Sequence, residues 1–90
     1  MILSADTEAL MRERLAPLAP QTMDIIDDSH LHAGHAGARN GGHYRLRIVS
    51  AAFAGKNTLA RHRLVHEALG DLMRSRIHAL SIQALAPDEH

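Results

Sequence analysis

The spacing at which apolar residues recur changes twice between residues 43 and 85, and these changes limit the folds that the chain can adopt. In HYRLRIVS, residues 43–50, apolar side chains alternate with arginines, which indicates a half-buried strand. Residues 58–75 then carry apolar side chains at a spacing close to one helical turn. Residues 77–85, IHALSIQAL, are apolar again and include β-branched members, which predicts another strand.

The helix over residues 58–75 is the longest element that the sequence predicts. Asn57 or Thr58 can cap its first turn. Gly70 lies inside the apolar pattern and weakens the prediction for the last turn. The buried face of this helix is expected to consist of Leu59, Val65, Leu69, Leu72 and Met73.

A first helix is predicted near the N-terminus. Ser4 or Asp6 can cap it, and Pro17 and Pro20 bring it to an end. Its apolar residues recur at spacings of four and three, so they share one face that we expect to enter the core: Met11, Leu15 and Leu18.

Residues 22–27, TMDIID, read as a short strand, and a long loop joins them to residues 43–50 in a predicted antiparallel hairpin. Residues 51–54 can form one short helical turn. The predicted order is therefore helix, strand, strand, short helix, long helix, strand. This order is typical of an α+β domain in which helices cover one face of a three-stranded sheet.

Composition narrows the classes of function. The 90 residues suffice for one domain, but a large internal active-site cavity would be hard to support. Lys+Arg and Asp+Glu both number 10, so nucleic-acid binding would need a local basic patch. The chain has no cysteine, so sulfur ligands for an iron site must come from another molecule. The charged N-terminus argues against a signal peptide or membrane span, and we expect a cytoplasmic protein.

Four histidines stand close together in DDSHLHAGHAGARNGGHY, residues 27–44. Imidazole is a common nitrogen ligand of transition metals, so this group of side chains suggests a metal site. A catalytic zinc needs three fixed ligands, an open position and a general base, and a glycine-rich loop lacks that rigidity. The sequence also shows no paired nucleophile and base, and no phosphate-binding loop. It therefore predicts a protein that is not an enzyme.

Five segments, in this order and with these gaps, resemble the BolA family: DDSHLHAGH, GHYRLRIVS, FAGK, ARHRLVHEAL and IHALSIQALAP. The resemblance covers residues 23–87. The segments RHRLV and HALSI match in their order of residues and not merely in their composition. It implies the class II KH-like αββααβ fold, in agreement with the order obtained from periodicity. We expect a single domain over residues 1–90, with a disordered tail allowed at 87–90.

Proteins similar to this one are partners of monothiol glutaredoxins and share a [2Fe–2S] cluster with them. They act in iron–sulfur trafficking and iron homeostasis, and some bacterial members regulate transcription in the stress response. The resemblance thus implies that a glutaredoxin supplies thiolates from its own cysteine and from bound glutathione, while this chain supplies imidazole nitrogen. The isolated chain is expected to hold no cofactor and to be monomeric.

The family pattern implies His78, at the start of the last strand, as one cluster ligand. The second comes from the loop between the first two strands, where His32 and His43 are the alternatives. His32 matches a loop position of the family, whereas His43 would be held by the following strand. The remaining histidines are interpreted as loop, helix-surface or terminal residues: His30, His35, His62, His66 and His90.

The alternative function is transcriptional regulation by a DNA-binding basic helical face. Lys56, Arg61 and Arg63 would then contact the nucleic acid. KH domains clamp a nucleic-acid backbone with a GxxG loop, and the corresponding AGKN of this chain has only one glycine. Arg61 and Arg63 can instead pair with carboxylates or contact an anionic partner, and we favour this interpretation.

Overall fold

The computed structural model describes residues 3–28 and 42–89. Its elements follow the predicted αββααβ order, with short 3-10 helices (η) between them, and so confirm the fold class. They are α1 (Leu3–Leu15), η1 (Ala16–Leu18), β1 (Thr22–Asp27), β2 (Gly42–Val49), η4 (Ala51–Phe53), α2 (Thr58–Leu69), α3 (Leu72–Ser75), β3 (Ile77–Leu85) and η5 (Pro87–Glu89).

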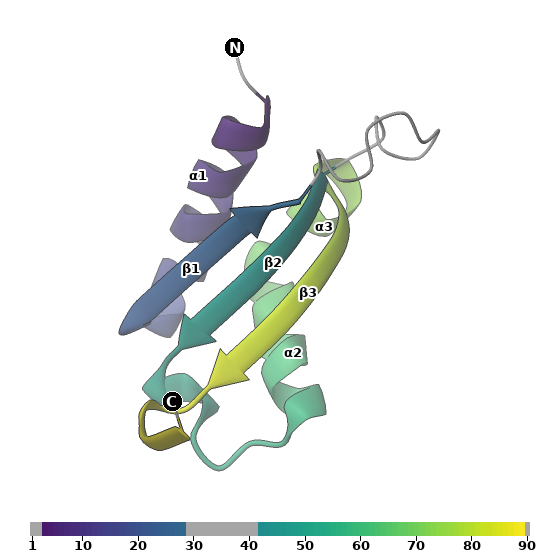
Figure 1. The fold of residues 1–90 in the computed structure, drawn as a ribbon. Helices are drawn as coiled ribbons and strands as arrows, with labels where there is room; N and C mark the ends of the chain where they lie inside the picture. The colour runs from purple at the N-terminus through teal and green to yellow at the C-terminus, as the bar shows by residue number, and fades with distance from the viewer. Residues whose placement is uncertain (1–2, 29–41, 90) are drawn as a thin grey trace.

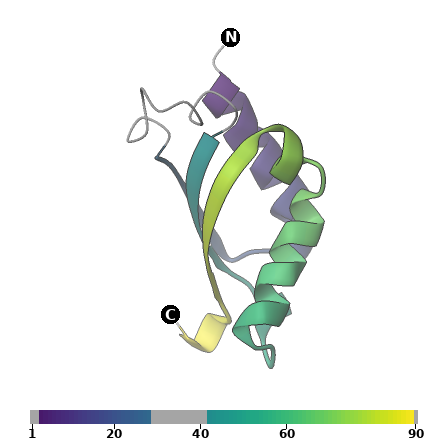
Figure 2. The ribbon, with the colours of Figure 1, turned by 90° about the vertical axis from the view of Figure 1, so that its right-hand side faces the viewer.

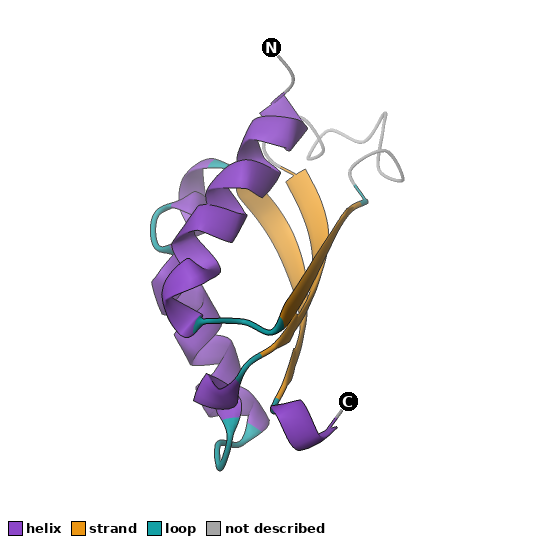
Figure 3. Ribbon diagram, turned by 90° about the vertical axis from the view of Figure 1, so that its left-hand side faces the viewer, coloured by secondary structure: helices purple, strands orange, loops and turns teal. Residues whose placement is uncertain are grey.

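The three strands form one sheet in the order β1-β2-β3. β1 and β2 are antiparallel, as predicted for the hairpin, with Thr22 paired to Val49 and Asp27 to Tyr44. β3 runs parallel to β2, which requires the long crossover that η4, α2 and α3 provide. The three α-helices lie on one face of the sheet and leave the other face open (Figures 1 and 3).

The core lies between this sheet and the helices. β2 contributes three side chains to the core cluster, at the alternating positions that the sequence indicated: Tyr44, Leu46 and Ile48. Met11 and Leu15 of α1 are fully buried against them, and Leu18 is partly buried, so the predicted apolar face of the first helix is confirmed. Burial of these apolar surfaces is the main force that holds the two layers together.

The prediction of a single helix over residues 58–75 is wrong for the last third of that range. α2 ends at Leu69, and Gly70 has φ +56° and ψ −129°, a conformation that residues with a Cβ rarely adopt. The side chain of Arg14 covers the break, because its Nη1 donates to the carbonyl of Leu69 (3.1 Å) and to Oδ1 of Asp71 (3.0 Å). The chain then resumes a helical path as α3, which begins at Leu72.

At the other end of α2, Asn57 is the cap, since its Oδ1 accepts a hydrogen bond from the N–H of Ala60 (2.9 Å). Leu59 was expected on the buried face but is 66% exposed. Six residues separate it from the buried Val65, which is about 1.7 helical turns, so the two side chains point in different directions.

The C-terminal turn is tied to α2 by Arg61. Its guanidinium donates to both carboxylate oxygens of Glu89 (2.5 and 2.9 Å) and to the carbonyls of Ala84 (3.0 Å) and Lys56 (2.8 Å). Glu89 also accepts from the N–H of Ala86 (2.9 Å). Residues 87–89, where the sequence allowed a disordered tail, therefore form an anchored 3-10 turn.

This anchor predicts a specific acid sensitivity. Arg61 and the Ala86 N–H stabilise the carboxylate, which lowers the pKa of Glu89 from 4.5 to about 2. Because the pKa in the folded chain is depressed, the stabilisation is complete above about pH 4.5 and is lost as the pH falls towards 2. We expect Glu89→Gln to lower Tm near neutral pH, and the difference from wild type to close as the pH approaches 2.

Thermal unfolding followed by circular dichroism measures this difference. Glu13→Gln is the matched control, because Glu13 is exposed on α1 and pairs with no basic side chain of the described residues. A Tm difference for Glu89→Gln that stays constant from neutral pH down to 2 would contradict the anchor.

Candidate metal centre

The start of β3 departs from a regular register with β2. Gly42 pairs with Ile77 and His43 with Ala79, so His78 is an extra residue of β3. A β-bulge of this kind redirects side chains. Side chains two residues apart in a regular strand lie on the same face of the sheet. Since Leu80 packs against the core, His78 in a regular strand would point towards the helices as well. Instead the side chain of His78 is exposed.

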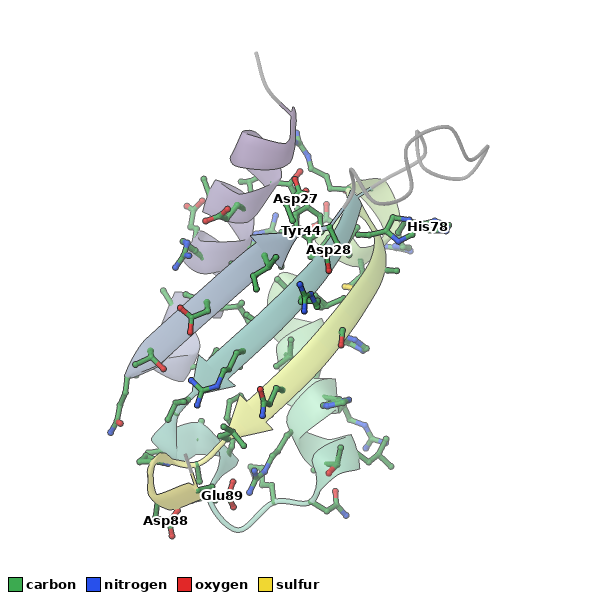
Figure 4. All side chains as sticks on the ribbon, in the orientation of Figure 1. Asp27, Asp28, Tyr44, His78, Asp88 and Glu89 are labelled. Atoms are coloured by element: carbon green, nitrogen blue, oxygen red, sulfur yellow. The ribbon has the colours of Figure 1, made fainter. Side chains whose placement is uncertain are left out.

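The bulge brings the rings of His43 and His78 together. Their centroids are 5.1 Å apart, and the ring planes are tilted by 46°. Two imidazoles bound to one tetrahedral metal ion, with metal–nitrogen distances of about 2.1 Å, have centroids roughly 5 Å apart. The spacing therefore fits two nitrogen ligands of one metal. Figure 4 places His78 at the end of the sheet where Asp27, Asp28 and Tyr44 also lie.

Backbone hydrogen bonds hold His43 from both sides. Its carbonyl accepts from the N–H of Asp28, the residue that follows β1 (2.7 Å). The preceding N–H, that of Gly42, donates to the carbonyl of Arg76 just before β3 (2.9 Å). His43 is thus fixed relative to both neighbouring strands, which is the rigidity that a metal ligand would need.

An ion pair ties Asp28, directly after β1, to Arg45 of β2. Nε of Arg45 donates to Oδ2 of Asp28 (2.6 Å), and Nη2 lies 3.4 Å from Oδ1. Arg45 stands two residues after His43, so both side chains belong to the open face of β2. The Asp28 side chain is 15% exposed, so the pair holds a largely covered carboxylate beside the carbonyl of His43.

Gly42 is required because the ring of Tyr44 fills the space of a side chain at this position. A Cβ at Gly42 would lie 2.7 Å from both Cζ and Oη of Tyr44 and closer still to Cε2. The ring cannot easily move, because Tyr44 is 3% exposed and its side chain is hydrogen-bonded to Thr7. Burial raises the pKa of Tyr44, and the Thr7 hydrogen bond offsets part of that increase.

Among the sequence-predicted ligands, the structure brings together His78 and His43. His32, the other alternative, falls in residues 29–41, outside the described residues, as do His30 and His35. Within residues 3–28 and 42–89, no group of three or more His, Asp or Glu side chains could hold a metal ion. The described residues therefore offer two ligands, and a metal bound to this pair would need further ligands from elsewhere.

The three basic residues that the sequence predicted to contact nucleic acid or a partner lie towards the opposite end of β3: Lys56, Arg61 and Arg63. Arg61 contacts Ala84 near the end of this strand, and its side chain is only 12% exposed because it holds Glu89. Lys56 and Arg63 are exposed and form no ion pair with a described residue. The structure therefore separates these three residues from the histidine pair. Of the two arginines expected to pair with carboxylates, Arg61 does so.

Sequence reasoning missed the residues that position His43, namely Asp28, Arg45 and Gly42. A weak signal was present, since DD precedes the histidine loop and an arginine follows it. Only the register between β1 and β2 shows that these residues meet.

The close approach of Gly42 to Tyr44 predicts that Gly42→Ala is destabilising. We expect the free energy of unfolding to fall by about 1–3 kcal/mol, the usual cost of overpacking. Denaturant unfolding of Gly42→Ala, Tyr44→Leu and the double variant measures the coupling. Replacing the ring should recover most of the loss that the added methyl group causes. Strict additivity would show that the two positions do not compete for space.

The Arg45–Asp28 ion pair predicts a local effect on the histidine pair. Asp28→Asn should reduce the free energy of unfolding by less than about 1 kcal/mol, because Arg45 is largely exposed. It should nevertheless weaken the nuclear Overhauser effect between the ring protons of His43 and His78. Asp24→Asn is the control, because Asp24 is exposed on β1 and forms no ion pair with a described residue. Equal ring contacts in both variants would rule out a positioning role for Asp28.

Comparison with known proteins gives a consistent result. A family model described as BolA-like protein matches residues 15–89. Mouse BolA-like protein 1 is 42% identical over 81 residues, which cover 89% of this chain and 58% of that protein. SufE-like protein 1, chloroplastic/mitochondrial, from Arabidopsis thaliana is 44% identical over 86 residues, covering 88% of this chain and 23% of that protein. The chain therefore spans only part of the length of these relatives.

The structural comparison agrees. BolA1 from Arabidopsis thaliana has a TM-score of 0.79 and 36% identity, covering 93% of this chain and 95% of the other. No helix within the described residues is long and apolar enough to cross a membrane. Since the family model covers most of the chain, and the relatives and the solved structure extend over nearly all of it, the chain belongs to the BolA family.

Proposed function

We propose that this protein shares a [2Fe–2S] cluster with a monothiol glutaredoxin and acts in iron–sulfur trafficking or iron homeostasis. His78 and His43 are the proposed ligands from this chain, with His32 as the alternative to His43. The 5.1 Å separation of the His43 and His78 rings carries this proposal, because it fits two ligands of one iron. The protein acts as a binding partner and not as an enzyme.

The ligand set supports a cluster held between two molecules. The chain has no cysteine, so it can offer nitrogen but no thiolate. The glutaredoxin supplies thiolates from its cysteine and from glutathione. Histidine in place of cysteine on one iron raises the reduction potential of a [2Fe–2S] cluster and makes binding dependent on proton concentration. The exposed His78 leaves one ligand accessible to a partner.

Positive charge near His78 supports an anionic partner. Arg74 lies in α3 and Arg76 between α3 and β3, and neither forms an ion pair with a described carboxylate. We infer that these two arginines, rather than Arg61 and Arg63, face the carboxylates of glutathione. Arg61 is occupied by Glu89 and lies at the other end of β3.

DNA binding by Lys56, Arg61 and Arg63 has less support. The internal bonds of Arg61 leave Lys56 and Arg63 as the exposed cations of that set. Roles in transcription and the stress response stay predictions, as do the cytoplasmic location and the monomeric state.

Titration of [2Fe–2S]-loaded monothiol glutaredoxin with this chain tests the proposal. We expect visible absorption and circular dichroism to change up to a one-to-one ratio, and the change to vanish with His78→Ala. His43→Ala and His32→Ala, measured separately, identify the second ligand. His66→Ala is the control, because His66 is exposed on α2. An unchanged spectrum with wild type, or a full change with His78→Ala, would overturn the proposal.

A further inference from the structure

The two edges of the sheet differ in how they are protected. β1, at one edge, carries Asp24 and Asp27, and Arg12 of α1 donates to the carbonyl of Met23 (3.2 Å). Charges and covered backbone groups are the usual means by which proteins prevent an edge strand from pairing with another chain. β3, at the other edge, is nine residues long and contains no Asp, Glu, Lys or Arg.

The hydrogen bonds show which backbone groups of β3 face outwards. The carbonyl of Leu85 accepts from the N–H of Ser50 and so faces β2 (2.9 Å). Backbone groups alternate along a strand, so Ser81 and Gln83 face β2 as well, whereas Leu80 and Ile82 face the free edge. The carbonyl of Ala84 also faces outwards, and the guanidinium of Arg61 covers it (3.0 Å).

The outward-facing stretch also retains uncovered apolar surface. Leu80 and Ile82 pack against the core but are only half-buried, and Ser81 and Gln83 between and beside them are exposed. Figure 2 faces this edge, and no helix passes in front of β3. A further strand would satisfy the N–H and C=O groups of Leu80 and Ile82 and would cover the rest of their side chains.

The position of this edge indicates which protein would bind. The free edge runs directly from the bulge at His78 to the covered carbonyl of Ala84. A partner that supplies ligands to a metal held by His78 must bring its own chain to this end of β3. We propose that an extended, uncharged segment of that partner pairs with β3 at Leu80 and Ile82. This inference rests on the proposed function.

Residue-resolved amide hydrogen exchange tests the pairing. The full chain is measured alone and with [2Fe–2S]-loaded monothiol glutaredoxin, and exchange is quenched before readout so that iron does not broaden the signals. We expect the Leu80 and Ile82 amides to exchange at least about tenfold more slowly in the complex. The Ser81 and Gln83 amides, already bonded to β2, should change little.

Ile82→Pro, compared with Ile82→Ala, provides a second test. Both variants remove the apolar side chain, but only proline removes the outward N–H, and no hydrogen bond to β2 is lost. We expect Ile82→Pro to weaken the complex at least about tenfold more than Ile82→Ala, as a disrupted strand pairing would. Equal affinities would overturn the pairing. If Ile82→Pro does not fold, amide exchange in the wild-type chain decides the matter.

The outcomes separate this inference from the proposed function. A spectral change without slower Leu80 and Ile82 exchange would overturn strand pairing and leave cluster sharing intact. Slower exchange without a spectral change would support strand pairing and overturn cluster sharing. Absence of both effects would overturn both. If the isolated chain shows the same protection as its concentration rises, the strand that pairs is a second copy, and the proposed partner is wrong.

Discussion

The parallel pairing of β2 with β3 is the constraint on which the candidate metal centre depends. Parallel strands begin at the same end of a sheet, so the crossover through α2 and α3 returns the chain to the level of Gly42. His43 and His78 become neighbours for this reason, although the whole crossover separates them in the sequence. The bulge then turns His78 outwards beside His43, where regular alternation would have turned it towards the core.

Arginines connect the elements around this pairing. Arg14 joins α1 to the break between α2 and α3, Arg61 joins α2 to the C-terminal turn, and Arg45 joins β2 to the end of β1. The chain contains one Tyr and one Phe, so large aromatic contacts are few. The guanidinium group, with five donors, can bind a carbonyl and a carboxylate together, as Arg14 and Arg61 do. These internal bonds explain why an abundance of arginine does not by itself indicate a nucleic-acid surface.

Local patterns predicted the elements and most of the core, because hydrophobic period and capping act over a few residues. They erred in two places along the predicted helix. Gly70 splits this helix in two, and Leu59 lies outside its buried face. The resemblance to the BolA family named His78, but neither pattern nor resemblance could choose between His32 and His43. The proximity of His43 to His78 depends on strand register and a bulge, which are long-range features that a local pattern does not encode.

Within residues 3–28 and 42–89, His43 and His78 are the two histidines whose rings meet, and a tetrahedral metal needs four ligands. In the proposed complex, the glutaredoxin supplies further ligands, so retention of the metal would depend on how firmly that partner is held. The proposed pairing at the uncharged edge of β3 would provide such a hold without adding a ligand, and release of that edge would release the metal as well. Under this proposal, binding of the partner and binding of the metal would be coupled, and such coupling suits transfer better than storage.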